Sequence, residues 1–341
     1  MTKRYPYLDL LRCLAIFFVV VLHVMTPVLT NQGLYGSTSW YVCLFQNSLN
    51  RAGVPLFLMI SGYLMLRDAR TLAVGRFYKK RLPRLLLPLA VWNGIYYIAH
   101  ALRAGEALSP VEYLRQLLNN GSSYHFWFVY TLLGIYLIAP FLKRMVDAAG
   151  VREQLILLAI VLFPGAIRPW LNMAGPIYIF LFDPLMESYL GYFLLGYLLG
   201  SQRLSKKVRA GIYLGGVAGF LIGSGGNLVT ASPEGVPLPF NMAYGLNHYL
   251  VAGAIFVLVR TFFETHEAGL ARLTKPLASL SGLVFGVYWV HVIALDLAGS
   301  FLGTAMPLPL LLALETVLTL ALSLGFSWVA SKVPVLRKCL L

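Results

Sequence analysis

The sequence has little charge. Of its 341 residues only 12% are charged, whereas 59% are hydrophobic, and a soluble domain needs about a quarter of charged residues to cover its surface. The hydrophobic residues lie in long runs such as Leu132–Leu142 and Leu308–Leu324. Runs that approach 20 residues match the roughly 30 Å hydrocarbon core of a bilayer. The composition therefore excludes an ordinary soluble protein and predicts one that spans a lipid bilayer.

Cysteine is scarce as well. Cys13, Cys43 and Cys339 are far apart and form no C-x-x-C pair, so neither a disulfide framework nor a zinc site is predicted, and we expect no metal. The apolar runs also lack the polar–apolar alternation of membrane strands. No recognised nucleic-acid-binding motif is present, so we expect no nucleic-acid partner. The predicted fold class is an all-α polytopic membrane helix bundle.

About ten segments are candidate transmembrane helices of a single domain over residues 1–341. The weakest is 153–168, because it is short and closed by Pro164 and Pro169. The candidate spans are residues 8–28, 43–66, 85–102, 125–142, 153–168, 177–200, 208–226, 244–262, 279–300 and 308–330.

The loops between these spans carry charge of one sign on one side. With ten spans, 22 of the 27 Lys and Arg residues fall on the side of both termini, and only Arg103, Arg115 and Arg168 fall on the other. Basic residues collect in cytoplasmic loops, so both termini are predicted to be cytoplasmic. This asymmetry accounts for the net charge of +14.

Ionisable residues inside the predicted spans are few and costly, so each needs a partner, a cavity or a purpose. The first span contains Asp9, Arg12 and His23. Eleven residues at about 100° each place Arg12 and His23 on one face, roughly 16 Å apart along the axis. Asp9 can pair with Arg12. The pattern fits either a structural ion pair with a buried histidine, or a functional stripe.

The segment Lys79–Arg84 lies at the predicted cytoplasmic entrance to the third span. Arg81 and Arg84 are three residues apart and share a face if this turn is helical. Paired guanidiniums suit phosphate oxygens, and the sequence has neither a P-loop nor a G-x-G-x-x-G turn that would hold a nucleotide otherwise. For Lys79 and Lys80 we prefer the ordinary role of orienting the chain in the membrane.

Two further histidines are predicted at the depth of His23. His125 lies among aromatic residues where the fourth span begins, and His291 lies in the outer half of the ninth. Aromatic residues at an interface usually anchor the protein, and a lone buried histidine is usually structural. Three histidines at one depth favour a site. Arg51, Glu187 and Glu315 are the other ionisable groups in spans; Glu187 fits either an orienting role or a structural ion pair.

These residues together resemble a known family, the acyltransferase-3 membrane family. The matches fall in order along the chain. They are Leu8-Asp9-x-x-Arg12 with His23, Val54–Tyr63 with its Ser61-Gly62-Tyr63, Arg81-x-x-Arg84, His125–Phe128, and Gly286–His291.

The resemblance implies a membrane O-acyltransferase of the bacterial inner membrane. Such a protein moves an acetyl or other short acyl group from cytoplasmic acyl-CoA, its co-substrate, to a hydroxyl of a surface sugar, glycolipid or polysaccharide precursor. Some members carry an appended extracellular esterase-like domain, whereas this chain ends at Leu341 soon after its last predicted span. A partner protein that completes transfer outside is therefore left open.

The expected residue roles follow from this resemblance and from the chemistry. Arg81, Arg84 and Arg12 would hold the phosphates of acetyl-CoA, and His23 would be the general base. His125, His291 and Arg12 would join His23 in catalysis. The candidates to stabilise the developing oxyanion are Tyr288, Trp127 and Ser61, and orienting roles fall to Asp9 and Glu187. Since no G-x-S-x-G elbow is present, direct transfer is preferred to an acyl-serine intermediate.

Two other classes of function fit the same features. A transporter of an acyl group or small anion would use the buried arginines and histidines as relay groups. A structural membrane subunit of a glycan-export complex would use its basic loops to dock partners, and changes at His23 would then matter little.

Overall fold

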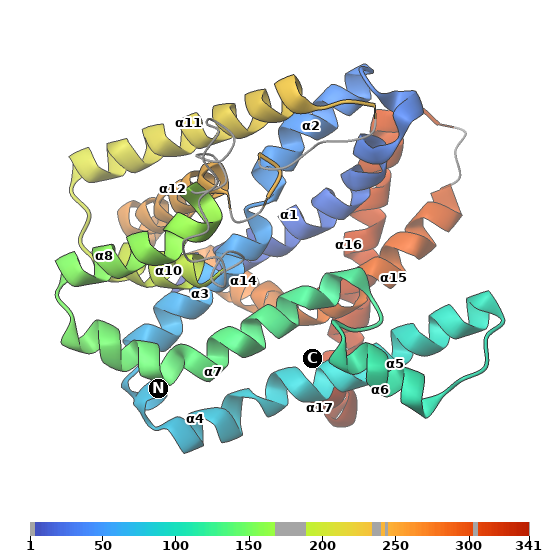
Figure 1. The fold of residues 1–341 in the computed structure, drawn as a ribbon, viewed down its shortest axis with the longest axis horizontal. Helices are drawn as coiled ribbons and strands as arrows, with labels where there is room; N and C mark the ends of the chain where they lie inside the picture. Colours follow the sequence, from blue (N-terminus) through green and yellow to red (C-terminus); the bar gives the residue numbers. More distant parts are fainter. Residues whose placement is uncertain (1–3, 168–188, 234–239, 243–244, 303–305, 341) are drawn as a thin grey trace.

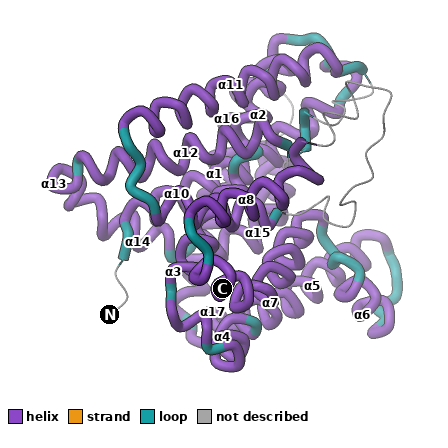
Figure 2. Tube along the Cα trace, turned by 60° about the vertical axis from the view of Figure 1, so that its left-hand side comes forward, coloured by secondary structure: helices purple, strands orange, loops and turns teal. Residues whose placement is uncertain are grey.

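The structure is a computed structural model, and it describes residues 4–167, 189–233, 240–242, 245–302 and 306–340. These residues form helices and no strand (Figures 1 and 2). The long helices are α1 (Pro6–Thr30), α2 (Thr38–Asn50) with α3 (Gly53–Arg67), α4 (Val74–Arg81) with α5 (Pro83–Ala104), α7 (Trp127–Ala148), α11 (Lys206–Thr230), α12 (Leu246–Thr265), α15 (Val284–Leu302) and α16 (Leu308–Lys332). The shorter helices are α6 (Pro110–Leu118), α8 (Val151–Leu162), α10 (Leu190–Ser201), α13 (Glu267–Leu270), α14 (Thr274–Ser281) and α17 (Pro334–Leu340).

Eight helical segments of the described chain are long and apolar enough to cross a bilayer. They correspond to eight of the ten expected spans, which confirms the all-α polytopic bundle. The expected spans 153–168 and 177–200 are represented by α8 and α10, which have 12 residues each. Residues 168–188 between them lie outside the described residues, and the candidate Glu187 is among them.

Helix α1 lies in the middle of the bundle (Figure 1). It contacts α2, α3, α12, α14, α15 and α16. Its buried apolar residues as far as Val19 belong to the main core, and those from Val20 on belong to a second core cluster. Such a position is possible because its sequence is apolar on nearly every side. The helix that carries Arg12 and His23 is therefore surrounded by protein, so both side chains face other helices.

Two long helical segments are interrupted, and each interruption carries a candidate arginine. The first break, at Arg51 and Ala52, separates α2 from α3. The second, at Leu82, separates α4 from α5, because Pro83 has no N–H to continue the helical ladder. Arg81 thus ends one helix and Arg84 lies in the first turn of the next.

Helices α3 and α10 pack closely against each other. A Cβ added at Gly62 would lie 1.8 Å from the carbonyl oxygen of Phe193, and one at Gly196 would lie 2.1 Å from that of Met59. Glycine at these positions lets the two backbones touch. The glycine of the Ser61-Gly62-Tyr63 stretch therefore has a packing role.

Candidate active site

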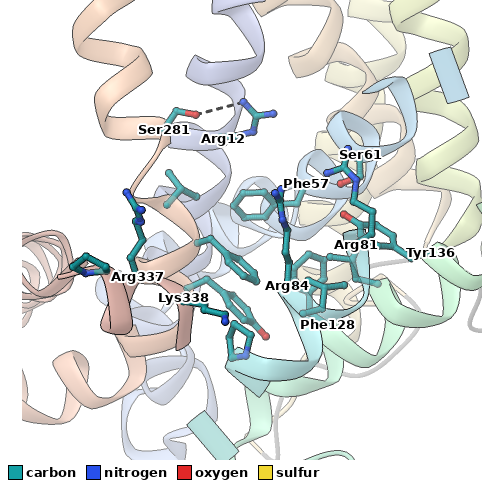
Figure 3. Close-up of a pocket in the computed structure, with 17 residues that line it drawn as sticks. Arg12, Phe57, Ser61, Arg81, Arg84, Phe128, Tyr136, Ser281, Arg337 and Lys338 are labelled. Atoms are coloured by element: carbon teal, nitrogen blue, oxygen red, sulfur yellow. Dashed lines mark hydrogen bonds between the residues drawn. The ribbon is translucent and has the colours of Figure 1, made fainter. Parts of the chain in front are cut away.

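A basic cavity of about 800 Å³ opens between helices of the bundle (Figure 3), with lining residues from α1, α3, α4, α5, α7, α14, α15 and α17. This volume lies in the range of roughly 300–1,000 Å³ that is usual for ligand pockets. Five cationic side chains line the cavity, and none of its lining residues is acidic. The five are Arg12, Arg81, Arg84, Arg337 and Lys338. We call this space the basic cavity.

Arg12 is held in the basic cavity by a buried carboxylate. Asp9, which is 2% exposed, accepts hydrogen bonds from Arg12 at 2.8 Å and from Arg4 at 2.8 Å. Ser281 of α14 donates a further bond to Asp9 at 2.7 Å. Charge-assisted bonds of this kind fix the direction of a guanidinium. Asp9 therefore orients Arg12 and leaves the rest of its fork towards the cavity.

Arg81 and Arg84 face the basic cavity from the α4–α5 break (Figure 3). Together with Arg12 they also line a neighbouring cavity of about 800 Å³, which includes Arg70 and Asp68. Arg70 donates to Asp68 through its side chain and its backbone, and these bonds lower the pKa of the Asp68 carboxyl. The carboxylate is thereby occupied locally, and the face that holds the two cavities stays strongly cationic.

The inner part of the basic cavity is apolar and aromatic. Phe57, Phe128 and Tyr288 line it, and Ser61 is the hydroxyl that α3 contributes. Tyr288 extends from this lining to the histidines, because its hydroxyl donates to the carbonyl oxygen of His125 at 2.8 Å. The cavity thus leads from Arg12 to Tyr288, and the three histidines lie beyond its lining.

The structure brings the three predicted histidines together. The ring of His23 stacks on that of His291 with centroids 5.2 Å apart, and His125 meets His291 edge-on at 4.9 Å. Tyr124 packs against His23 at 5.1 Å. The imidazoles come from α1, from the turn before α7 and from α15. The three histidines, which the sequence predicts at one depth, therefore also form one cluster of contacting rings.

The hydrogen bonds of this cluster define one tautomer. His291 Nδ1 lies 2.6 Å from the carbonyl oxygen of Tyr288, and since a carbonyl only accepts, the proton is on Nδ1 and Nε2 keeps its lone pair. His125 Nδ1 lies 2.9 Å from Ser123 Oγ. The Nε2 atoms of His125 and His291 are buried and have no hydrogen-bond partner within the described parts of the chain. Such buried, unbonded nitrogens are uncommon and favour a functional site.

Arg51 lies at the level of His23. The preceding residue, Asn50 at the end of α2, packs its amide against the sulfur of Met25 at 3.9 Å, and a Cβ at Gly53 would touch the carbonyl oxygen of Ala15. Arg51 is thus held between two contacts that bracket His23 along α1. Its Nε atom is buried and unbonded within the described residues. The sequence marked this arginine as costly but suggested no role for it.

The other expected residues are distributed unevenly. Ser61 and Tyr288 line the basic cavity. Trp127 packs its ring on Tyr189 at 5.0 Å and is not part of that lining. Arg337 and Lys338 were missed by the sequence reasoning, because a basic pair after the last span is typical of topogenic charge.

The comparisons with known proteins agree with this architecture. A family model described as an acyltransferase domain matches residues 5–332. The chain belongs to this acyltransferase family. A segment of 99 residues is 34% identical to the succinoglycan biosynthesis protein ExoH of Rhizobium meliloti (strain 1021), which is 27% of this chain and 25% of that relative. The matched segment thus spans about a quarter of the relative's length. No solved structure matches.

Family membership and the eight apolar helices make the chain a multi-pass membrane acyltransferase. In this acyltransferase the matched region contains Arg12, the Arg81–Arg84 pair and all three histidines. Helix α17 follows the matched region, although its basic residues line the same cavity. The roles of individual side chains in the acyltransferase stay predictions.

Proposed function

We propose that this acyltransferase transfers an acetyl or other short acyl group from cytoplasmic acyl-CoA to a hydroxyl of a cell-surface sugar, glycolipid or polysaccharide precursor. One observation carries the proposal. A cavity with five cationic residues reaches Tyr288, whose hydroxyl bonds to the backbone of a three-histidine cluster. This arrangement supports an anionic donor and a basic catalyst at successive positions along one helix, α1.

The basic cavity suits coenzyme A in both charge and shape. Its cations would bind phosphate oxygens, to which guanidiniums donate paired hydrogen bonds. Its inner lining of Phe57, Phe128 and Tyr288 would contact the thin pantetheine arm. The arm would then pass Tyr288 and present the thioester to His23. Since Arg12 and His23 lie about 16 Å apart along α1, a long arm between phosphate and thioester is required.

His23 would act as the general base. It takes the proton of the acceptor hydroxyl while the oxygen attacks the thioester carbonyl. The tetrahedral intermediate then collapses, the carbon–sulfur bond breaks, and the coenzyme A thiolate receives the proton from His23. The products are the acyl ester and free coenzyme A. His291 stacks on His23 and would hold the orientation of its ring.

The oxyanion of the intermediate needs a hydrogen-bond donor. Of the three candidates, Tyr288 packs its ring against two histidines, with ring centroids 5.4 Å from that of His125 and 6.1 Å from that of His291. Its hydroxyl donates to the His125 carbonyl, so stabilising the oxyanion would require this bond to switch. Ser61 lies in the basic cavity with Arg12, which favours a place along the arm.

The acceptor assignment depends on the family and on the relative. The relative is described as a succinoglycan biosynthesis protein, and a sugar hydroxyl is a suitable nucleophile for a thioester. Acetyl is the expected group and the bacterial inner membrane the expected location. A partner protein that completes transfer outside is compatible with the same donor chemistry.

The decisive test is acyl transfer by the purified protein in detergent, with labelled acetyl-CoA and isolated surface glycans. We expect release of free coenzyme A and an acceptor that is heavier by one acyl unit in mass spectrometry. Mass spectrometry of surface glycans from cells with and without the protein identifies the acceptor. Uptake of label into vesicles without an acylated product would instead support the transporter.

A further inference from the structure

Helix α17 contributes to the basic cavity although it follows the family's matched region. This seven-residue helix, Pro334–Leu340, comes directly after α16. Arg337 and Lys338 are on the cavity side of the helix, and Pro334 belongs to the same lining (Figure 3). Two of the five cations of the cavity thus come from a segment outside residues 5–332.

A buried tryptophan fixes α17 in this place. Trp92 of α5 is 2% exposed, and its Nε1 donates to the carbonyl oxygen of Leu340 at 3.1 Å. The Trp92 ring packs against Trp289 of α15 and Phe326 of α16. The last turn of α17 is therefore held by the core of the bundle, which gives Arg337 and Lys338 defined positions.

The cations of the basic cavity form two separate groups. Figure 3 shows Arg337 and Lys338 on one side of the cavity, and Arg81 and Arg84 on the other. Two groups of cations across one cavity suit a ligand with two separate anionic centres. Coenzyme A has such centres: the diphosphate, to which pantetheine is attached, and the 3′-phosphate on the ribose.

The neighbourhood of each group decides which phosphate it would take. Arg81 and Arg84 share both of the adjoining cavities with Arg12 on α1, whereas the α17 pair lines the basic cavity alone. The diphosphate must lie near α1, because the pantetheine arm that leaves it has to run along α1 to His23. The 3′-phosphate is on the other branch of the molecule and points away from the arm.

We propose that Arg337 and Lys338 of α17 bind the ribose 3′-phosphate of coenzyme A, while Arg81 and Arg84 bind its diphosphate. This inference rests on the proposed acyl-CoA donor and adds a recognition element to it. The pair would make the enzyme select coenzyme A over donors that lack the 3′-phosphate. Hydrogen bonds between charged groups are strong enough for a preference of about tenfold or more.

The test is calorimetric binding of coenzyme A and of 3′-dephospho-coenzyme A to the purified full chain in detergent. The wild type should bind coenzyme A about tenfold or more tightly than the dephospho form. Arg337→Ala with Lys338→Ala should reduce the affinity for coenzyme A to that for the dephospho form. The affinity for the dephospho form should stay unchanged. Arg81→Ala with Arg84→Ala should weaken both ligands by the same factor.

Lys206→Ala with Lys207→Ala is the matched control, because these exposed lysines at the start of α11 carry the same charge but do not line the basic cavity. This variant should keep the wild-type preference. If the alanine pair in α17 fails to fold, Arg337→Gln with Lys338→Gln removes the charge and keeps polar side chains.

Four outcomes would overturn the inference. An α17 variant that keeps the wild-type preference excludes its contact with the 3′-phosphate. If the α17 variant loses affinity for both ligands by the same factor, α17 contributes only general positive charge. If the wild type loses coenzyme A binding in nanodiscs with anionic lipid but keeps it in neutral nanodiscs, Arg337 and Lys338 bind lipid headgroups instead. A wild type that binds neither ligand refutes the proposed donor itself, and the α17 assignment with it.

Discussion

The imidazole of His23 lies inside the bundle, between the ring of His291 and that of Tyr124. Arg51 is bracketed at the same level along α1. Ionisable groups at such depth cost at least a few kcal/mol each, so each one needs a partner, a cavity or a function. Single substitutions at His23 and Arg51 distinguish a functional role of each residue from a packing role.

Replacing His23 by alanine should abolish acyl transfer, because the acceptor hydroxyl would lose its base. General base catalysis typically contributes about 10²–10⁴-fold, so turnover should fall by at least that factor. The measurement is product formation by purified variant and wild type. Size-exclusion elution should stay unchanged, since the histidine is only partly buried. Wild-type turnover in a folded variant would refute the base assignment.

Arg51→Met tests whether the Arg51 guanidinium, whose buried Nε has no hydrogen-bond partner among the described residues, is functional. Methionine has a similar length and no charge, and replacing buried charge by an apolar group is often neutral or stabilising. We expect an equal or higher Tm together with turnover lowered about tenfold, which corresponds to roughly 1.4 kcal/mol in the activation barrier.

The control for Arg51→Met is Arg103→Met, which removes an exposed arginine paired with Asp296 at 3.0 Å. This change should leave turnover as it is. A strongly lowered Tm in Arg51→Met with normal turnover per folded molecule would show that Arg51 is a structural residue.

At the scale of elements, the α3–α10 contact determines how the Ser61-Gly62-Tyr63 stretch is used. Gly62 faces the backbone of Phe193, while Ser61 lines the basic cavity and Tyr63 accepts a hydrogen bond from Arg67. Three consecutive residues of one helix thus serve packing, the cavity and the basic face. The close packing of α3 on α10 therefore requires glycine at position 62.

Gly62→Ala should destabilise the protein by roughly 3 kcal/mol, at the upper end of what overpacking usually costs. The added methyl group would lie 1.8 Å from a carbonyl oxygen, so α10 must move. Thermal unfolding in detergent measures the effect.

Gly134→Ala in α7 is the matched change, because nothing lies within 4 Å of the added Cβ. Alanine favours a helix interior over glycine, so this variant should be as stable as the wild type or more so. Equal stability of the two variants would contradict the close α3–α10 contact.

The scale of the element also shows how far sequence reasoning reaches. Hydropathy located eight spans, because each long helix carries an apolar run of sufficient length. It also counted 153–168 and 177–200 as spans, where the described helices α8 and α10 have 12 residues each. The break at Leu82 follows from Pro83. The break at Arg51 likewise has a proline, Pro55, four residues later, which has no N–H to bond the carbonyl oxygen of Arg51.

For the candidate site, periodicity placed Arg12 and His23 on one face, and the depth of His125 and His291 could be judged from span position. That the three rings touch is a property of how α1, α7 and α15 pack, which no local pattern contains. The same holds for α17, whose position depends on a hydrogen bond from Trp92, 248 residues away in the chain.

The whole molecule has one strongly cationic face. The basic cavity has five cations, and the neighbouring cavity adds Arg4, Arg67, Arg70 and Lys80, with Asp9 and Asp68 already engaged in ion pairs. A face of one sign raises the local concentration of an oppositely charged ligand. Electrostatic binding of this kind weakens as salt shortens the screening length.

We therefore expect the Kd of coenzyme A to rise about tenfold between roughly 50 mM and 500 mM salt. Calorimetry at a series of salt concentrations checks this expectation. The variant with alanine at Arg81 and Arg84 should show a shallower dependence, because fewer cations contact the ligand. A Kd that does not depend on salt would exclude a phosphate-rich donor.

The hydrogen bond between Trp92 and Leu340 has a practical consequence for anyone who handles this enzyme. An affinity tag fused directly after the last residue would pull on the turn that this bond secures. The spans would still insert and the purified protein would look intact, while its assay signal for coenzyme A was reduced. Tags in the α5–α6 connection at Gly105, where the chain is exposed and turns with positive φ, leave that turn alone.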